Sequence, residues 1–273
     1  MVGGLYANMK HNYNFLVENT MMNSHILQIC EMLNVKRLVN ILSTCVFPDK
    51  SKLPLTSDQI LDSPPHESNY GYAYSKRWLY IGSKALAHMK MDMEIVNLIP
   101  TNLYGENDNF NLDFSHVIPG LIHKCYLAKE NNRPFVINGN GLAKRQFVYA
   151  HDFANIILHF VDCELFSRFE SIIVSPPESD EISIQNLVDI IVNTFNFKGP
   201  VTYNIEQSNG QLKKTASDME LRRYLPTFEF TTLQKGIKQV VQHFCETRSH
   251  HNHITPTPSN STGLGSNSTG SGH

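Results

Sequence analysis

Residues 37–43 read Arg-Leu-Val-Asn-Ile-Leu-Ser, a largely apolar run that is typical of a buried β-strand. The stretch before it, Asn12 to Leu33, has helical periodicity, and so has the later stretch from Tyr72 to Met89. Strand-like Met93 to Ile99 follows that second helical stretch. Such alternation of helices and strands predicts an α/β fold with a parallel sheet and helices on its faces.

The alternation continues toward the C-terminus. After about Arg145 its segments become shorter, and they fit a smaller second lobe that is interleaved in sequence with the first. The further segments are helical His116 to Lys129 and strand-like Pro134 to Asn138, followed by Asp152 to Val161, Ser171 to Ser175, Ser183 to Phe195 and Thr232 to Phe244.

Composition and charge exclude several classes of protein. The chain has 273 residues, of which 41% are hydrophobic and 18% charged, as in an ordinary globular protein of one large or two small domains. A formal net charge of −2 gives no electrostatic reason to expect nucleic acid or an anionic membrane as a partner. No apolar run is long enough to span a membrane, and the N-terminus lacks the features of a signal peptide.

The five cysteines are odd in number, are not clustered and show no zinc-ligand spacing. They therefore predict reduced thiols in a cytoplasmic protein without a metal site. From Ser249 to His273 the chain is rich in Ser, Thr, Asn, Gly and Pro, and we expect this tail to be disordered.

Ser43, Tyr72 and Lys76 form a pattern with chemical meaning. Tyr72 and Lys76 share one helix face at a spacing of four, and Ser43 closes the predicted strand. An ammonium group lowers the pKa of a nearby tyrosine, which can then donate a proton to a carbonyl oxygen that a serine holds. The Tyr-x-x-x-Lys spacing also occurs at Tyr6/Lys10 and Tyr80/Lys84, where a solvated helix pair is the simpler interpretation. Only Tyr72 has both a serine-ended strand before it and a strand with a loop after it.

Several stretches in a fixed order resemble one family, the GDP-L-fucose synthases, which are NADPH-dependent epimerase-reductases of the extended short-chain dehydrogenase group. The matching stretches are Met1-Val2-Gly3-Gly4, Leu42-Ser43-Thr44-Cys45-Val46-Phe47-Pro48, Tyr72-Ala73-Tyr74-Ser75-Lys76, Pro100-Thr101-Asn102-Leu103-Tyr104-Gly105, Asp108-Asn109-Phe110, His116-Val117-Ile118-Pro119-Gly120-Leu121 and Gly210-Gln211-Leu212-Lys213-Lys214. They extend over roughly Met1 to Cys245, which makes the resemblance specific although no single stretch would be.

The resemblance implies a Rossmann-type doubly wound parallel sheet with a smaller α/β substrate-binding lobe. Residues 1–145 would then be a partial NADP-binding domain with the catalytic residues, residues 146–248 mostly the substrate-binding lobe, and residues 249–273 the tail. The implied reaction epimerises GDP-4-keto-6-deoxy-D-mannose at C3 and C5 and then reduces it at C4 with NADPH. The implied partners are the GDP-sugar and a second copy of the chain, and not nucleic acid or a membrane.

The resemblance also implies roles for individual residues. Ser43, Tyr72 and Lys76 match the catalytic trio, and Cys45 and His116 match the pair that epimerises; taken alone, Cys45 is also compatible with a buried apolar position and His116 with a helix start. The implied cofactor-binding residues are Ile41, Leu42, Ser43, Thr44, Lys76, Pro100, Thr101, Asn102, Leu103 and His116. The implied substrate-binding residues are Lys124, Asn138, Arg145 and Asn209.

The implied homodimer would pair through two helices. Asn12 to Leu33 carries Phe15, Leu16, Met22, Ile26, Leu27, Ile29 and Met32, and Tyr72 to Met89 carries Trp78, Leu79, Ile81 and Leu86. The alternative is that these side chains simply pack on the sheet.

The sequence departs from the family pattern at three places. Asn138 stands where a Trp is usual, Asn209 stands where an acidic residue is usual, and no glycine-rich phosphate loop occurs before residue 37. We expect the missing loop to belong to two βα units, about 60–70 residues, before Met1, and residues 1–273 alone to bind NADPH weakly.

The alternatives are an incomplete version of an ordinary enzyme, an inactive isoform that acts as a binding or dimerisation partner, and another nucleotide-sugar epimerase or dehydratase. The pair Cys45 and His116 disfavours the last of these.

Overall fold

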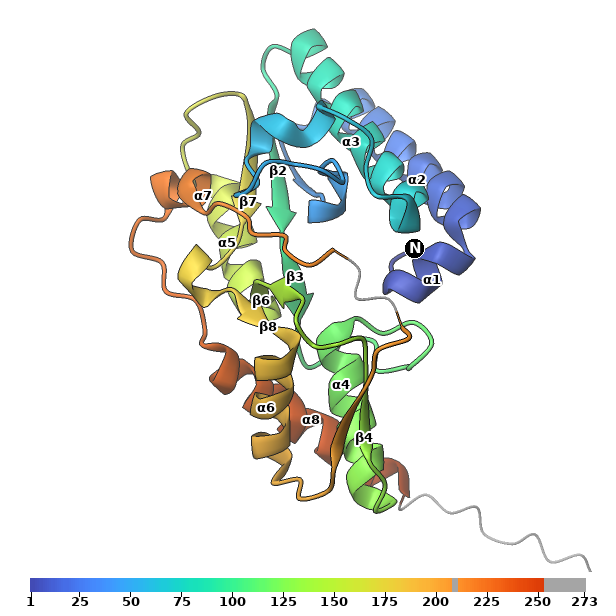
Figure 1. Ribbon diagram of the computed structural model, residues 1–273. Helices are drawn as coiled ribbons and strands as arrows, with labels where there is room; N and C mark the ends of the chain where they lie inside the picture. The colour runs from blue at the N-terminus through green and yellow to red at the C-terminus, as the bar shows by residue number, and fades with distance from the viewer. Residues whose placement is uncertain (208–210, 253–273) are drawn as a thin grey trace, which may run out of the picture.

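The computed structural model describes residues 1–207 and 211–252 and centres on a parallel sheet of three strands (Figure 1). The strands lie in the order β1 (Arg37–Ile41), β2 (Glu94–Pro100) and β7 (Phe169–Val174). All pairs are parallel, with Ile41 opposite Leu98 and Pro100 opposite Val174. The carboxyl ends of the three strands therefore meet at one edge of the sheet.

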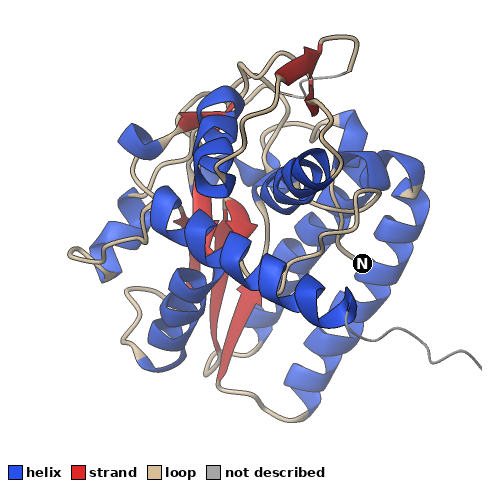
Figure 2. Cartoon of the chain, turned by 90° about the horizontal axis from the view of Figure 1, so that it is seen from below, coloured by secondary structure: helices blue, strands red, loops and turns tan. Residues whose placement is uncertain are grey.

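Alternating side chains of β2 face opposite sides of the sheet, as the two-residue period of a strand requires. Ile95 and Ile99 pack in the cluster that contains side chains of α2 (Asn12–Met32) and α3 (Tyr70–Met89). Val96 and Leu98 pack in the cluster that contains the buried face of α5 (Ala150–Asp162). Helices thus lie on both sides of the strands (Figure 2). The prediction of a Rossmann-like doubly wound fold is confirmed.

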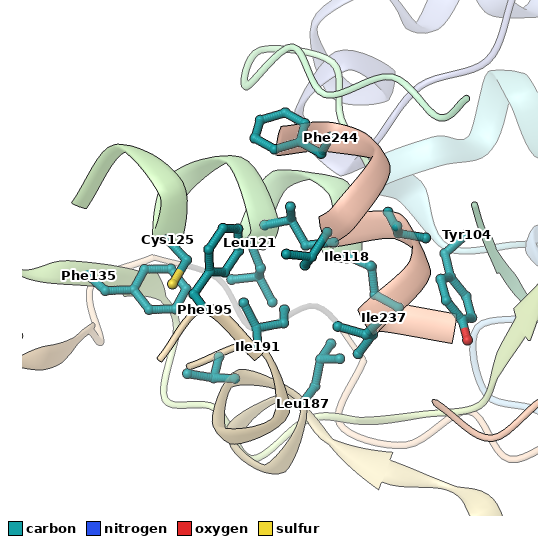
Figure 3. Close-up of a cluster of buried hydrophobic side chains, with 14 of the residues drawn as sticks. Tyr104, Ile118, Leu121, Cys125, Phe135, Leu187, Ile191, Phe195, Ile237 and Phe244 are labelled. Atoms are coloured by element: carbon teal, nitrogen blue, oxygen red, sulfur yellow. The ribbon is translucent and has the colours of Figure 1, made fainter. Parts of the chain in front are cut away.

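A second core lies beyond the carboxyl edge of the sheet, in the lower part of Figure 1. There α4 (Val117–Glu130), α6 (Ile184–Phe195) and α8 (Leu233–Asn252) pack together beside the parallel pair of β4 (Phe135–Asn138) and β9 (Val201–Asn204). Figure 3 shows that side chains of these helices and of Tyr104 point toward one another. Phe135, Ile137, Leu187 and Ile191 are among its buried members.

Short elements connect the two cores. The parallel pair of β3 (Asn102–Tyr104) and β6 (Phe147–Tyr149) continues from β2, and β5 (Lys144–Arg145) pairs antiparallel with β8 (Ile182–Ser183). The remaining elements are the helices α1 (Leu5–Lys10) and α7 (Met219–Tyr224) and the 3₁₀ turns η1 (Thr44–Val46), η2 (Ser57–Leu61), η3 (Glu67–Asn69) and η4 (Glu178–Asp180).

The chain crosses between the two cores in both directions, so a boundary at residue 145 does not separate them. β7 and α5 follow that residue and yet pack in the sheet region, whereas α4 and β4 precede it and pack in the second core. The expected tail boundary at Ser249 is also wrong, because α8 continues to Asn252. The rest of the expected tail, 253–273, lies outside the described residues.

Most of the major elements fall within about two residues of their predicted ranges, but α8 continues well past its predicted end at Phe244, to Asn252, and Ser43 does not belong to the strand. β1 ends at Ile41 because Ser43 is the N-cap of η1 and accepts a hydrogen bond from the backbone of Cys45. The sequence did not predict the short elements α1, α7, β3, β5, β6, β8 and β9. None of the five cysteines forms a disulfide, and no helix within the described ranges has the length and hydropathy of a membrane span.

Buried amides join the sheet to α3. Asn40 Nδ2 donates to Ser83 Oγ at 2.8 Å and to Asn97 Oδ1 at 3.1 Å. Asn97 Nδ2 in turn donates to the carbonyl of Glu170 on β7 at 3.2 Å. Because each amide is buried, loss of one member leaves its partners without hydrogen bonds in an apolar setting.

We predict that Asn97→Leu lowers the free energy of unfolding by about 1–3 kcal/mol, since Asn40 loses an acceptor and the β7 carbonyl loses a donor. Urea denaturation followed by circular dichroism measures the change. The control is Asn107→Leu in an exposed loop, for which we expect a change within about 0.5 kcal/mol. Equal stability of Asn97→Leu and the wild type would contradict the prediction.

Candidate active site

The candidate site lies where β1 and β2 end. Leu42 N donates to the carbonyl of Leu98 at 2.8 Å, which extends the pairing by one residue past β1 and holds the two strand ends together. Ile41 and Asn102 are exposed at this edge, whereas Leu42, Thr44 and Pro100 are buried and Leu103 is half-buried. In an open α/β sheet this edge is where ligands bind.

Cys45 lies in the turn directly after β1. Ser43 Oγ accepts from the backbone N–H of Cys45 at 3.4 Å, and the side chain of Cys45 is only 6% exposed. Burial raises the pKa of the Cys45 thiol, while the side chain of Ser43 and the charges of Lys214, Lys76 and Arg77 act in the opposite direction. Burial outweighs these groups, so the pKa of the thiol lies above its ordinary value, and the three cations reduce that shift.

Tyr72 and Lys76 come from the first turns of α3 and lie beside the same turn. Lys76 Nζ donates to the carbonyl of Ile41 at 2.7 Å and lies 5.8 Å from the ring centroid of Tyr72. Phe15 of α2 contacts Tyr72 edge-on, with ring centroids 6.1 Å apart. The structure thus brings Ser43, Cys45, Tyr72 and Lys76 together at the end of β1.

The expected lowering of the Tyr72 pKa by Lys76 is wrong for this structure. The pKa of Tyr72 lies well above its usual value, first because the phenol is buried and second because an ionised Cys45 repels a phenolate. Lys76 directs its ammonium to the Ile41 carbonyl instead, and burial lowers the pKa of Lys76. Tyr72 is consequently a protonated phenol near neutral pH.

His116 lies on a different element from Cys45. It is the N-cap of α4, its side chain is 44% exposed, and its Nδ1 is 3.8 Å from Asp108 Oδ1. No hydrogen bond or ion pair joins His116 to Cys45 within the described residues.

A chain of close packing nevertheless connects His116 with Tyr72. Gly4 N donates to the carbonyl of Phe114 at 3.0 Å, and a Cβ at Gly4 would lie 2.3 Å from the Ser115 carbonyl oxygen. A Cβ at the adjacent Gly3 would lie 3.3 Å from Phe15, the residue that contacts Tyr72. The glycines therefore allow the segment before His116 to approach the Tyr72 side of the site.

Lys214 is a site residue that the sequence did not identify. Burial, which is the largest cause, and the charge of Arg145 lower the pKa of Lys214 to about 8, while Cys45 and Asp49 act in the opposite direction. Leu55 fixes this segment by pairing with Ala216 and by donating to the carbonyl of Thr215 at 2.8 Å. Lys213-Lys214 looks like a solvated pair in the sequence, because contacts between residues so far apart leave no local signal.

Of the four predicted substrate-binding residues, Lys124 and Asn138 lie on elements of the second core, and Arg145 lies on the connecting strand β5. Burial lowers the pKa of Lys124 on α4 and of Arg145 on β5, and Glu181 partly opposes the shift at Arg145. Asn138 is exposed at the carboxyl end of β4. Asn209 lies outside the described residues. Arg145 and Cys45 both influence the pKa of Lys214, which indicates that β5 and the turn after β1 approach each other at this lysine.

The strand ends have a donor set that fits the nicotinamide end of a dinucleotide. Thr101 Oγ1 is buried just after β2 and has no hydrogen-bond partner within the described residues. Such an orphaned hydroxyl suits a polar ligand at this edge. Within 1–207 and 211–252 no three His, Cys, Asp or Glu side chains gather as metal ligands.

Comparisons with known proteins agree with this geometry. The sequence model of the NAD dependent epimerase/dehydratase family matches residues 1–165. The GDP-L-fucose synthase of Dictyostelium discoideum is 40% identical over 245 residues, which are 90% of this chain and 76% of that protein. The probable GDP-L-fucose synthase of Drosophila melanogaster is 37% identical over 253 residues, 90% of this chain and 78% of that protein.

A solved structure matches equally well. The crystal structure of a GDP-L-fucose synthetase from Naegleria fowleri bound to NADP has a TM-score of 0.84 and 40% identity, and it covers 91% of this chain and 75% of that one. Sequence and fold lead to the same family. The chain belongs to the NAD dependent epimerase/dehydratase family and, within it, to the GDP-L-fucose synthases.

Proposed function

We propose that the protein makes GDP-L-fucose, by 3,5-epimerisation of GDP-4-keto-6-deoxy-D-mannose followed by NADPH-dependent reduction at C4. The observation that carries the proposal is the gathering of Ser43, Cys45, Tyr72 and Lys76 at the end of β1. A hydroxyl, a phenol and an ammonium suit reduction of a ketone, and a thiol beside them suits proton removal next to that ketone. The names and the solved NADP complex of the relatives support the substrate and the cofactor.

In the reduction, Tyr72 donates its proton to the C4 oxygen while the Ser43 hydroxyl holds that oxygen. The raised pKa of Tyr72 keeps the phenol protonated until the oxygen acquires negative charge. Bound NADPH supplies the hydride. The residues that would hold the nicotinamide end of NADPH are Ile41 to Thr44, Lys76, Pro100 to Leu103 and His116.

In the epimerisation, the C4 ketone acidifies the hydrogens on C3 and C5. The Cys45 thiolate removes a proton from one face of the sugar, and His116 returns one to the other face. The exposed imidazole of His116 suits a group that exchanges protons with solvent. A cysteine and a histidine on opposite sides of the sugar explain why a reductase site carries both.

The remaining assignments divide the molecule by ligand. The three-stranded sheet takes the dinucleotide, and the second core takes the GDP-sugar through Lys124, Asn138, Arg145 and Asn209. The guanidinium of Arg145 suits bidentate binding of the diphosphate. Cysteines that form no disulfide fit a protein that works in the reducing cytoplasm.

The proposed homodimer uses the outer face of α2 and α3. Four of the side chains that we expected at this interface are buried within the subunit instead, because they pack beneath the two helices. They are Phe15, Leu27, Leu79 and Leu86. An exposed apolar stripe remains, made up of Met22, Ile26 and Ile29 on α2, Leu33 directly after α2, and Tyr70, Tyr74, Trp78 and Ile81 on α3. Spacings of three and four keep each set on one helix face, as a four-helix interface between two copies requires.

We predict that Tyr72→Phe abolishes C4 reduction and leaves epimerisation near the wild-type rate, because only the reduction uses the phenolic proton. NADPH oxidation measures the first step, and NMR of solvent deuterium entering C3 and C5 measures the second. Tyr74→Phe on the same helix is the control and should retain both activities. Joint loss of both activities in Tyr72→Phe would contradict this separation of roles.

Cys45→Ser and His116→Asn should each slow deuterium exchange by about 10²–10⁴-fold, the usual range for a positioned acid or base. A serine hydroxyl is too weak a base near neutral pH, and an asparagine cannot transfer a proton there. Cys30→Ser and His88→Asn are the matched controls. Wild-type exchange in both site variants would return Cys45 and His116 to purely structural roles.

Lys214 should titrate near pH 8 rather than in the ordinary lysine range of about 10.4. Reductive methylation with ¹³C and NMR of the dimethylamine signals measures this pKa, and Lys214→Arg identifies the signal. Because the folded state holds this proton less tightly than the unfolded chain, the Lys214 contribution to stability rises between about pH 8 and 10.4. A lysine titration above pH 10 at this position would disprove the prediction.

Ile26→Glu should weaken the dimer by at least about tenfold, because a carboxylate in the centre of an apolar interface loses its water. Light scattering after gel filtration should give a dimer mass for the wild type and a monomer mass for the variant at micromolar concentration. Leu158→Glu places the same charge on an exposed leucine of α5 and should leave the mass unchanged. A monomeric wild type would reject the interface.

A further inference from the structure

Arg77 is a buried cation beside the site that the proposed reaction steps leave without a role. It follows Lys76 on α3 and is only 6% exposed. Its Nε donates to the carbonyl of Val46 at 2.7 Å, and its Nη2 donates to the carbonyl of Ser63 at 2.8 Å. None of the ion pairs within the described residues includes Arg77.

A buried guanidinium that bonds only to carbonyl oxygens is expensive for a fold to keep. Neutral carbonyls satisfy its N–H groups but do not neutralise its charge, and removal of a charge from water costs several kcal/mol as an order of magnitude. Tyr74 offers its ring 5.7 Å away, which compensates only part of that cost. A neutral side chain could donate the same hydrogen bonds. The hydrogen bonds therefore do not explain why a charged side chain stands at this position.

The place of Arg77 supplies that explanation. Val46 directly follows Cys45 in η1, so the bond to its carbonyl fixes the turn that carries the thiol against α3. The bond to Ser63 holds the following loop to the same side chain. The charge of Arg77 also acts on Cys45, together with those of Lys76 and Lys214.

We propose that Arg77 is a positioning residue for Cys45: it fixes the turn that carries the thiol through the Val46 carbonyl, and its unneutralised charge stabilises the thiolate. This inference rests on the proposed role of Cys45 in epimerisation. Arg77 itself contacts neither substrate nor cofactor. Lysine at this position would keep the charge and one donor, whereas glutamine would keep a donor and lose the charge.

The first measurement follows the thiol without any substrate. The ultraviolet absorbance of the thiolate is recorded against pH for the wild type, Arg77→Lys and Arg77→Gln. From each curve we subtract the curve of the same protein that also carries Cys45→Ala, which leaves the signal of Cys45. The thiolate should form at higher pH in Arg77→Gln than in the wild type, and Arg77→Lys should restore most of the difference. Lys84→Gln, which removes an exposed cation from the same helix, should leave the titration unchanged.

The second measurement is deuterium exchange at C3 and C5 of the keto-sugar. Arg77→Gln should slow it by roughly 10–100-fold, the effect of misplacing a reacting group by about 1 Å, and the exchange rate should reach its maximum at higher pH. Arg77→Lys should recover most of the rate. C4 reduction of an already epimerised substrate should change less than threefold in both variants, because Tyr72 and Lys76 remain.

The outcomes separate this inference from the proposed function. If Cys45→Ala abolishes exchange while both Arg77 variants keep the wild-type titration and rate, Arg77 has no such role. If Arg77→Gln and Arg77→Lys lose activity equally and neither moves the thiolate titration, the residue is only structural and the inference fails. Wild-type exchange in Cys45→Ala would overturn the proposed function, whatever Arg77 does to the titration.

Discussion

The close approach of α3 to the sheet is the constraint on which the rest of the site depends. Ala73 and Ser83 are fully buried small residues of this helix, Ala73 in the cluster with Ile95 and Ile99 and Ser83 bonded to Asn40, so the helix backbone can lie near β1 and β2. Gly71 allows a similar approach to α2, since a Cβ there would lie 2.2 Å from the Asn12 carbonyl oxygen. Larger side chains at these positions would lift Tyr72 and Lys76 away from the strand ends, and a reacting group displaced by about 1 Å loses much of its effect.

The parts of the fold that repeat locally could be predicted from the sequence. The alternation of helices and strands gave the sheet, and the spacing of Tyr72 and Lys76 placed both residues on one face of α3. Ser43 was assigned to the end of β1, near which the structure has it, although the strand stops two residues before it; Cys45 was assigned only through the family resemblance. These features depend on side-chain periodicity, which is visible in a short window.

The features that the sequence did not reveal depend on contacts between distant residues. Lys214 enters the site because Leu55 and Ala216 pair across more than 160 positions, and Gln146 bonds to the backbone of Ala216 in both directions. The direction of the Tyr72 pKa shift was missed because burial and the neighbouring thiol, not Lys76, determine it. The burial of Tyr72 arises only when the elements of the core have packed together, so a short window of sequence does not reveal it.

The repeated crossing of the chain between the two cores has a consequence for how the protein is made. β2 pairs with β7 over about 70 positions of sequence, and α5, which covers the second face of the sheet, lies between them. A ribosome must therefore synthesise the chain past Val174 before the sheet can close, while β1 and β2 wait with one face uncovered. Long-range parallel pairing is slow and exposes apolar strands to other chains. During synthesis the nascent chain should depend on chaperones for longer than a protein whose lobes follow one another in sequence.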